Sequence, residues 1–179
     1  MSFAIRKLHV CVLVIATSIA LTACVSTGEP EDSNKETERP VAMSEVSLEE
    51  AKTQAQAMEL EIAGLVPSEV VMSVDQMPKG TLFSCSATEW TWYGATTVTV
   101  VEGTDIEEIV RSVQTHYEGS RFEMRTRLNV SNHFEVHLMS PETAENYIVA
   151  EGSAPNEIRI ASGSVCFALP EGTWPGGEF

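Results

Sequence analysis

Positively charged side chains are scarce in this chain. Its 179 residues contain 11 lysines and arginines against 26 aspartates and glutamates, so the formal net charge at pH 7 is −15. A surface of that sign repels the phosphates of nucleic acids and of anionic lipid headgroups. We therefore expect no nucleic-acid partner. Solubility of an exported domain is the simplest role of the acidic surface, and attraction of a basic partner or a divalent cation is the alternative.

Motifs that carry catalysis are also missing. The chain contains no G-x-S-x-G, S-x-x-K, H-E-x-x-H or G-x-G-x-x-G pattern and no P-loop, although each of these marks a common type of active site. Asp105, Glu107 and Glu108 form an acidic group, but they stand at the start of an expected helix, where the helix dipole explains them. We therefore predict no enzyme and no cofactor, with an envelope hydrolase as the less favoured alternative.

Only one long hydrophobic run occurs, at residues 8–20. A helix of about thirteen residues rises roughly 20 Å, which is less than the ~30 Å hydrocarbon core of a membrane. The run follows Arg6 and Lys7, and this order is typical of a signal peptide. The segment is therefore interpreted as a signal rather than as a stable membrane span.

The motif Leu21-Thr22-Ala23-Cys24 directly follows this run. It resembles the lipobox of bacterial lipoproteins, in which an aliphatic residue and two small residues precede a cysteine. The resemblance implies that the Cys24 thiol receives a diacylglyceryl group and that a dedicated peptidase cleaves before it. An ordinary cleavage site needs a small residue where Leu21 stands. We expect residues 1–23 to be a lipoprotein signal peptide.

The same resemblance predicts the location of the protein. Two acyl chains on Cys24 are enough for lasting attachment to a lipid bilayer, whereas a single chain binds only marginally. The expected location is therefore the extracytoplasmic face of the cell membrane. Residues 24–46 are rich in polar and acidic side chains and contain too few apolar residues to fold. They are interpreted as the lipidated cysteine and a disordered acidic tether.

Cysteine is rare, with four residues in the chain. Cys11 lies in the signal and Cys24 is the lipidation site, so Cys85 and Cys166 remain for the exported domain. An even pair in an oxidising compartment predicts a structural disulfide. The bond would close a loop of about 80 residues, for which chain entropy predicts roughly 4.5 kcal/mol of stabilisation. No C-x-x-C pattern or Cys/His cluster favours a metal or redox pair instead.

Two segments have the periodicity of amphipathic helices. Residues 47–64 begin with the capping box Ser47…Glu50, and residues 105–118 follow Thr104, which is expected to cap them. Each apolar stripe is interpreted as packing on the domain itself, with partner binding as the alternative. The apolar positions of the first are Leu48, Ala51, Ala55, Met58, Ile62 and Leu65, and those of the second are Ile106, Ile109, Val110, Val113 and Tyr117.

Short segments of strand-forming residues occupy most of the remaining chain. We expect strands at residues 80–85, 95–101, 122–130, 134–139, 147–150, 158–161 and 165–169. Short strands with two helices indicate an α+β fold, an antiparallel sheet with two amphipathic helices packed on one face and one disulfide. Residues 47–170 form this single domain, and residues 171–179 are a C-terminal coil with Trp174 against the domain.

The hairpin at residues 122–139 allows its register to be predicted. Two sets of inward-facing positions share one face only if the loop has an odd number of residues, so a three-residue turn, 131–133, is expected. The first set is Phe122, Met124, Thr126, Leu128 and Val130, and the second is Phe134, Val136 and Leu138. That register places Arg127 opposite His137 and Asn129 opposite Glu135.

His133, Glu135 and His137 in this hairpin are the best metal candidates in the chain. The two histidines would stand roughly 13 Å apart along an extended strand, too far to converge on one ion. The expected neighbour of His137, Arg127, would also oppose a cation. We predict no metal site.

Trp90 and Trp92 share one face of an extended segment. Two exposed tryptophans would stack on a sugar ring and suit an envelope-glycan or small-molecule receptor. The favoured interpretation is that they fill the core near the disulfide, because large aromatic side chains are mostly buried.

The whole chain loosely resembles the small acidic lipoproteins of unknown function in actinobacterial envelopes. This resemblance depends on the lipobox, the acidic tether and the two-cysteine domain. The sequence therefore predicts a membrane-tethered, non-catalytic binding module. The expected partner is an envelope protein outside the cell membrane, and a glycan or small molecule is the alternative. The sequence indicates no oligomeric state.

Overall fold

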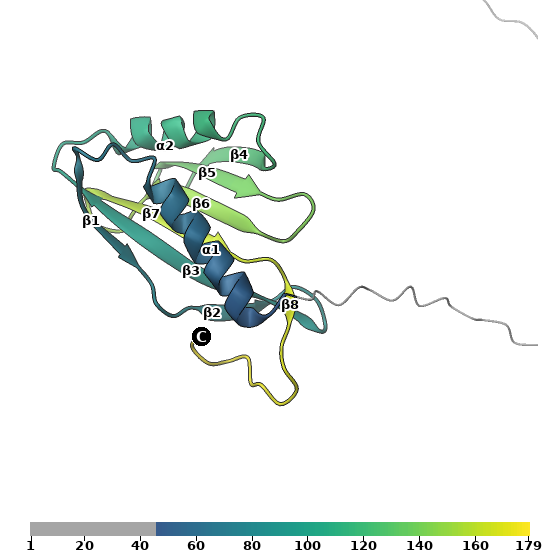
Figure 1. The fold of residues 1–179 in the computed structure, drawn as a ribbon. Coiled ribbons are helices and arrows are strands. Elements are labelled where there is room, and N and C mark those ends of the chain that lie inside the picture. The colour runs from purple at the N-terminus through teal and green to yellow at the C-terminus, as the bar shows by residue number, and fades with distance from the viewer. Residues whose placement is uncertain (1–45) are drawn as a thin grey trace, which may run out of the picture. The chain divides into compact units, whose positions relative to one another are not determined.

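Residues 46–179 are described by the structure, a computed structural model (Figure 1). The expected signal peptide, the lipidation site Cys24 and the tether up to residue 45 lie outside the described residues. The described part forms the following elements: α1 (Leu48–Ala63), β1 (Val71–Gln76), β2 (Thr81–Ser84), β3 (Glu89–Val100), α2 (Ile106–His116), β4 (Glu123–Leu128), β5 (Phe134–Met139), β6 (Asn146–Glu151), β7 (Glu157–Gly163) and β8 (Phe167–Ala168).

All eight strands belong to one antiparallel sheet. Its main path runs β1-β3-β7-β6-β5-β4, and the short strands β2 and β8 pair with the first part of β3. The long strand β3 therefore organises the sheet, because four other strands pair with it. The segment 95–101 predicted as a strand is only the second half of β3, since residues 89–94 continue it.

Strand β1 was not expected from the sequence. It is an edge strand that pairs only with β3, and its register shifts between Val71 and Ser73. Most of its side chains are exposed. An exposed, irregular edge strand has no need for alternating apolar residues, so the pattern that normally predicts a strand is missing.

Both helices cover the same face of the sheet, which confirms the predicted α+β architecture. Helix α1 crosses β3 and β7, and α2 lies over β5 and β6 (Figure 1). The Ser47 hydroxyl accepts a hydrogen bond from the Glu50 amide at 3.2 Å, as the capping box predicts. Helix α2 is capped by Asp105, whose side chain accepts from the Glu108 amide at 3.0 Å, and not by Thr104. The expected apolar stripes of both helices face the sheet.

The core consists of two clusters between the helices and the sheet. The larger one joins α1, α2 and the inward side chains of β3, β5, β6 and β7. The smaller one lies under the first turns of α1. Burial of each large apolar side chain contributes about 1.5–3 kcal/mol. The buried members of the smaller cluster are Ala51, Ala55, Leu82, Trp92 and Phe167.

The hairpin between β4 and β5 has an odd loop, as predicted, but its register differs by two residues. Leu128 pairs with Phe134, which leaves a five-residue loop at 129–133 instead of the expected three-residue turn. Arg127 therefore lies opposite Glu135, and Arg125 lies opposite His137. The predicted pairings of Arg127 with His137 and of Asn129 with Glu135 are wrong.

Asn129 explains the longer loop. Its side-chain oxygen accepts hydrogen bonds from the amides of Ser131 and His133 at 2.9 and 3.0 Å. Asn132 adopts a left-handed backbone conformation with φ of 63°, which asparagine tolerates better than most residues. This turn leaves Val130 fully exposed, so the expectation that Val130 joins the apolar face is also wrong.

Residues 171–179 contain no helix or strand, in agreement with the expected C-terminal coil, but the coil is attached at Phe179. Phe179 and Gly80 exchange two backbone hydrogen bonds at 2.7 and 3.0 Å, and the Trp92 ring nitrogen donates to the Phe179 backbone oxygen at 3.1 Å. Trp174, which was expected to pack on the domain, is 74% exposed. Phe179 packs against the smaller core cluster instead.

Candidate functional site

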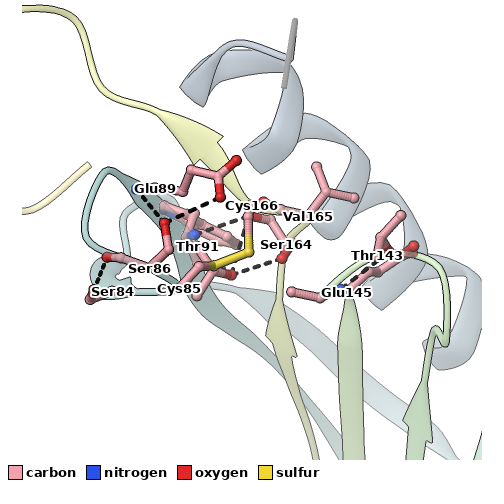
Figure 2. Close-up of a disulfide and its surroundings, with 12 residues drawn as sticks. Ser84, Cys85, Ser86, Glu89, Thr91, Thr143, Glu145, Ser164, Val165 and Cys166 are labelled. Atoms are coloured by element: carbon pink, nitrogen blue, oxygen red, sulfur yellow. Dashed lines mark hydrogen bonds between the residues drawn. A yellow bond between two sulfur atoms is a disulfide. The ribbon is translucent and has the colours of Figure 1, made fainter. Parts of the chain in front are cut away.

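The two cysteines of the domain form the predicted disulfide. The Cys85 and Cys166 sulfurs are 2.05 Å apart (Figure 2). Cys85 directly follows β2 and Cys166 directly precedes β8, so the bond joins the two short strands that flank the start of β3. Beside it, the Thr91 hydroxyl donates to the Ser164 backbone oxygen at 2.8 Å. The disulfide stabilises this end of the sheet.

Trp92 belongs to the core and is not available to a ligand. Its side chain is 0% exposed and packs against Ala51 and Ala55 of α1. Its ring lies so close to Gly94 that a side chain at that position would collide with it. Trp90 is partly buried against the same cluster. The core-filling interpretation is confirmed for Trp92, and a sugar platform made of both tryptophans is excluded, because stacking needs open ring faces.

Of the candidates His133, Glu135 and His137, the structure brings only Glu135 and His137 together. The His137 ring nitrogen Nε2 lies 2.6 Å from Glu135, and the Arg127 guanidinium donates to the same carboxylate oxygen. His133 lies instead near Glu151, with 3.4 Å between the Nδ1 and carboxylate atoms. Within residues 46–179, no three His, Cys, Asp or Glu side chains are grouped so that they could hold a metal ion.

Glu135 is held as an anion at this position. Burial of its carboxylate would by itself raise its pKa, but the hydrogen bonds from Arg127 and His137 outweigh that effect. The net result is a pKa of Glu135 below its ordinary value. The three side chains therefore form a hydrogen-bonded network across β4 and β5.

A second network involves Glu59, a residue that the sequence reasoning missed. Glu59 is 0% exposed and lies on the face of α1 that contacts the sheet. One of its carboxyl oxygens accepts from the Thr96 hydroxyl at 2.8 Å and the Gln76 amide at 2.9 Å, and the other accepts from the Ser162 hydroxyl. The network thus joins α1 to three strands.

The sequence did contain a signal for this network. Glu59 is four residues from Ala55 and three from Ile62, so it stands within the apolar seam of the helix. Thr96 and Ser162 are likewise polar residues at inward-facing strand positions. Since Glu59 is 0% exposed and all its partners belong to the domain, the network positions α1 on the sheet.

A third network lies near the end of α2. The Arg121 guanidinium donates two hydrogen bonds to Glu145, at 2.7 and 2.8 Å, and the Tyr147 hydroxyl donates to the same carboxylate at 2.9 Å. Burial and the Glu145 charge raise the pKa of Tyr147. Burial opposes ionisation of Glu145, but the bonds from Arg121 and Tyr147 prevail and lower the pKa of Glu145.

The other side of the sheet carries neither α1 nor α2, and we call it the helix-free face. Side chains alternate along each strand, so every second residue points away from α1 and α2. The centre of this face consists of small or apolar side chains, and charged residues lie around it. Its central residues are Ala95, Ile148, Ala150 and Ala161, and its peripheral residues include Asp75, Arg125, Arg127, Glu135, His137 and Arg159.

The helix-free face is less acidic than the rest of the domain. Residues 46–179 contain 7 lysines and arginines and 20 acidic residues. Three of the seven cations lie on strands and point out of this face, but only five of the twenty acids do so. Most of the negative charge is therefore on the helices and loops.

Two hollows open at the margins of the helix-free face. One, of about 210 Å³, includes Lys79, Tyr93 and Arg159 in its lining, and the other, of about 240 Å³, includes His137 and Ile148. Both are smaller than the roughly 300–1,000 Å³ pockets that hold drug-sized ligands or cofactors. They suit single side chains or small molecules.

The geometry thus defines an α+β domain whose sheet has one helix-covered and one helix-free face, with a disulfide at one end. Comparison of the chain with protein-family models, with curated proteins and with solved structures gave no match. Between residues 46 and 179, neither helix is long and apolar enough to cross a membrane.

Proposed function

We propose that this protein is a lipoprotein of the extracytoplasmic membrane face, and that its domain is a non-catalytic binding module for an envelope protein. The motif Leu21-Thr22-Ala23-Cys24 after a short hydrophobic run supports lipid anchoring. The disulfide between Cys85 and Cys166 fits an oxidising compartment outside the cytoplasm.

The helix-free face carries the proposed binding role. Six strands lie side by side in its main path, and at ~4.8 Å between neighbouring strands they span about 24 Å. At the centre of this face Ile148 and Ala161 are partly exposed, whereas Ala95 and Ala150 are buried. A partner can therefore contact the face at Ile148, at Ala161 and at the charged side chains around them. Charged residues around an apolar centre are the usual arrangement of a protein–protein interface.

The anchor is tested by mass spectrometry of the protein recovered from membranes. We expect a mature chain that begins at Cys24 and carries diacylglyceryl on its sulfur. Cys24→Ala should yield a chain that is not lipidated and is released from the membrane on disruption of the cells. A wild-type chain with residue 24 unmodified and the preceding segment still attached would refute the anchor.

The binding face is tested by photo-crosslinking from single positions of the membrane-bound full-length protein. A photoreactive residue at Ala161, on the helix-free face, should crosslink to one protein species of defined mass. The matched control is Ala57, an exposed alanine on α1, which should give no such product. Ile148→Arg, which adds a charge to the centre of the face, should abolish the product, whereas Ala57→Arg should not.

Equal crosslinking from both alanines would contradict the assignment of the binding role to this face. The same conclusion would follow if Ile148→Arg folded normally, as judged by circular dichroism, and crosslinked as well as the wild-type protein.

A further inference from the structure

One hollow on the margin of the helix-free face has an unusual set of lining groups. Lys79, Thr81, Tyr93 and Arg159 surround it, and each of these side chains carries a hydrogen-bond donor. The loop between β1 and β2 supplies Lys79, whereas Tyr93 and Arg159 come from the adjacent strands β3 and β7. Segments far apart in the sequence therefore bring four donors to one place.

These donors have no partner inside the domain. Within residues 46–179, none of the four side chains makes a hydrogen bond or an ion pair with another residue, whereas Arg111, Arg121 and Arg127 each pair with a glutamate. Glu178 also lines the hollow, and the amide of Gly80 in its wall donates to a Phe179 oxygen at 2.7 Å. In a domain with 20 acidic residues, Lys79 and Arg159 share this hollow and pair with none of them, so both remain available to an added anion.

We propose that this hollow binds a carboxylate group. The inference rests on the proposed use of the helix-free face as a binding surface, and it names the chemistry that this surface recognises at its margin. Arginine and lysine are the usual partners of a carboxylate, and hydrogen bonds between such charged groups are stronger than those between neutral ones. The volume of about 210 Å³ admits a group of the size of a glutamate side chain.

The net negative charge of the domain does not prevent this binding. At physiological ionic strength the Debye length is about 8 Å, so exposed charges farther away are largely screened. The groups that line the hollow therefore decide the affinity. Binding should weaken as salt is added, because the local attraction is screened. If the overall repulsion dominated, salt would strengthen binding instead.

The test is an NMR titration of the full-length protein in a non-ionic detergent, read from the amide signals of Gly80 and Gly94. The probes are the blocked tripeptides Ala-Glu-Ala and Ala-Gln-Ala, sodium acetate and inorganic phosphate. The glutamate peptide should shift both signals saturably, and the glutamine peptide should not. Lys79→Gln and Arg159→Gln should each weaken binding at least tenfold, whereas the control Arg111→Gln on α2 should have no effect.

Several results would overturn the proposal: equal binding of the two peptides, tighter binding of phosphate than of either carboxylate, or an equal loss in Arg111→Gln. The source of the carboxylate is read from the probes. Tighter binding of the glutamate peptide indicates a protein side chain, and tighter binding of acetate indicates a small free carboxylate. Both outcomes support the shared chemistry.

The two proposals can be refuted independently. If Ala161 still crosslinks while the glutamate peptide does not bind, the carboxylate site is refuted and the proposed binding face is retained. If Ala161 gives no product at all, the proposed function falls.

Discussion

Glu59 can be replaced by methionine to remove the buried acceptor at nearly constant volume. The hydroxyls of Thr96 and Ser162 would then lose their acceptor, whereas Gln76 would keep its bond to the Gln56 backbone oxygen at 2.8 Å. A buried polar group without a partner costs about 1–3 kcal/mol. Two such hydroxyls predict a loss of roughly 2–6 kcal/mol, a large part of the ~5–15 kcal/mol stability of a typical domain.

Two further variants separate the loss of the acceptor from the other effects of this substitution. In Glu59→Gln, the amide oxygen still accepts from Thr96 and Gln76, and the amide nitrogen can donate to the Ser162 oxygen once that hydroxyl turns. The expected loss is therefore about 1 kcal/mol or less, the value of one ordinary hydrogen bond. Combining Glu59→Met with Thr96→Val and Ser162→Ala removes the orphaned hydroxyls, so stability should largely return, because apolar replacement of all partners is nearly neutral.

The assay is urea unfolding at pH 7, followed by tryptophan fluorescence, with Trp92 as the buried reporter beneath α1. The midpoint should fall in the order wild type, Glu59→Gln, Glu59→Met, with an unchanged slope. The reasoning is refuted if the glutamine and methionine variants are equally stable, or if the triple variant is no more stable than Glu59→Met alone.

Three further predictions concern the crosslink and the titrating groups. The double variant Cys85→Ala/Cys166→Ala should lower the free energy of unfolding by about 4.5 kcal/mol, as chain entropy predicts for a separation of 81 residues. Chemical reduction of the disulfide should lower it by the same amount. A loss below about 1 kcal/mol would contradict the argument from loop closure. Folding lowers the pKa values of Glu135 and Glu145. The stabilisation from these two carboxylates is therefore present above the unfolded pKa, about 4.5, and is lost as the pH falls through the folded values. The urea midpoint of Glu135→Gln should fall less steeply with decreasing pH than the midpoint of the wild-type protein. Folding raises the pKa of Tyr147. Its contribution to the free energy of unfolding is therefore complete below pH ~10 and is lost as the pH rises further. In Tyr147→Phe the unfolding midpoint should decline less at alkaline pH, and an unchanged decline would argue against this contribution.

Features set by neighbouring residues were predictable from the sequence. Helix α1 follows from the Ser47 cap and an apolar seam, both of which lie within one short segment. Strand β5 was predicted with its correct bounds, because Phe134, Val136 and Leu138 alternate with polar residues. The disulfide followed from counting, since only Cys85 and Cys166 remained for the domain.

Features set by contacts between distant residues were not predictable in this way. The β4–β5 register depends on side-chain capping by Asn129, which competes with the apolar pattern that suggested a shorter turn. The Glu59 network needs α1, β3 and β7 to meet before its partners are apparent. The docking of Phe179 on Gly80 joins residues 99 positions apart, and no local pattern predicts it. The helix-free face likewise exists only once both helices lie on one side.

The position of the disulfide has a mechanical consequence. The bond closes the chain between Cys85 and Cys166, so α1 lies outside the covalently closed part. Beyond its apolar contacts, α1 is held by hydrogen bonds such as that of Lys52 to Pro78 at 2.8 Å and that of Gln56 to Met77 at 2.9 Å. A force applied through Val46 would therefore pull α1 away first, while strands β3 to β7, which lie between the two cysteines, stay within the covalently closed loop.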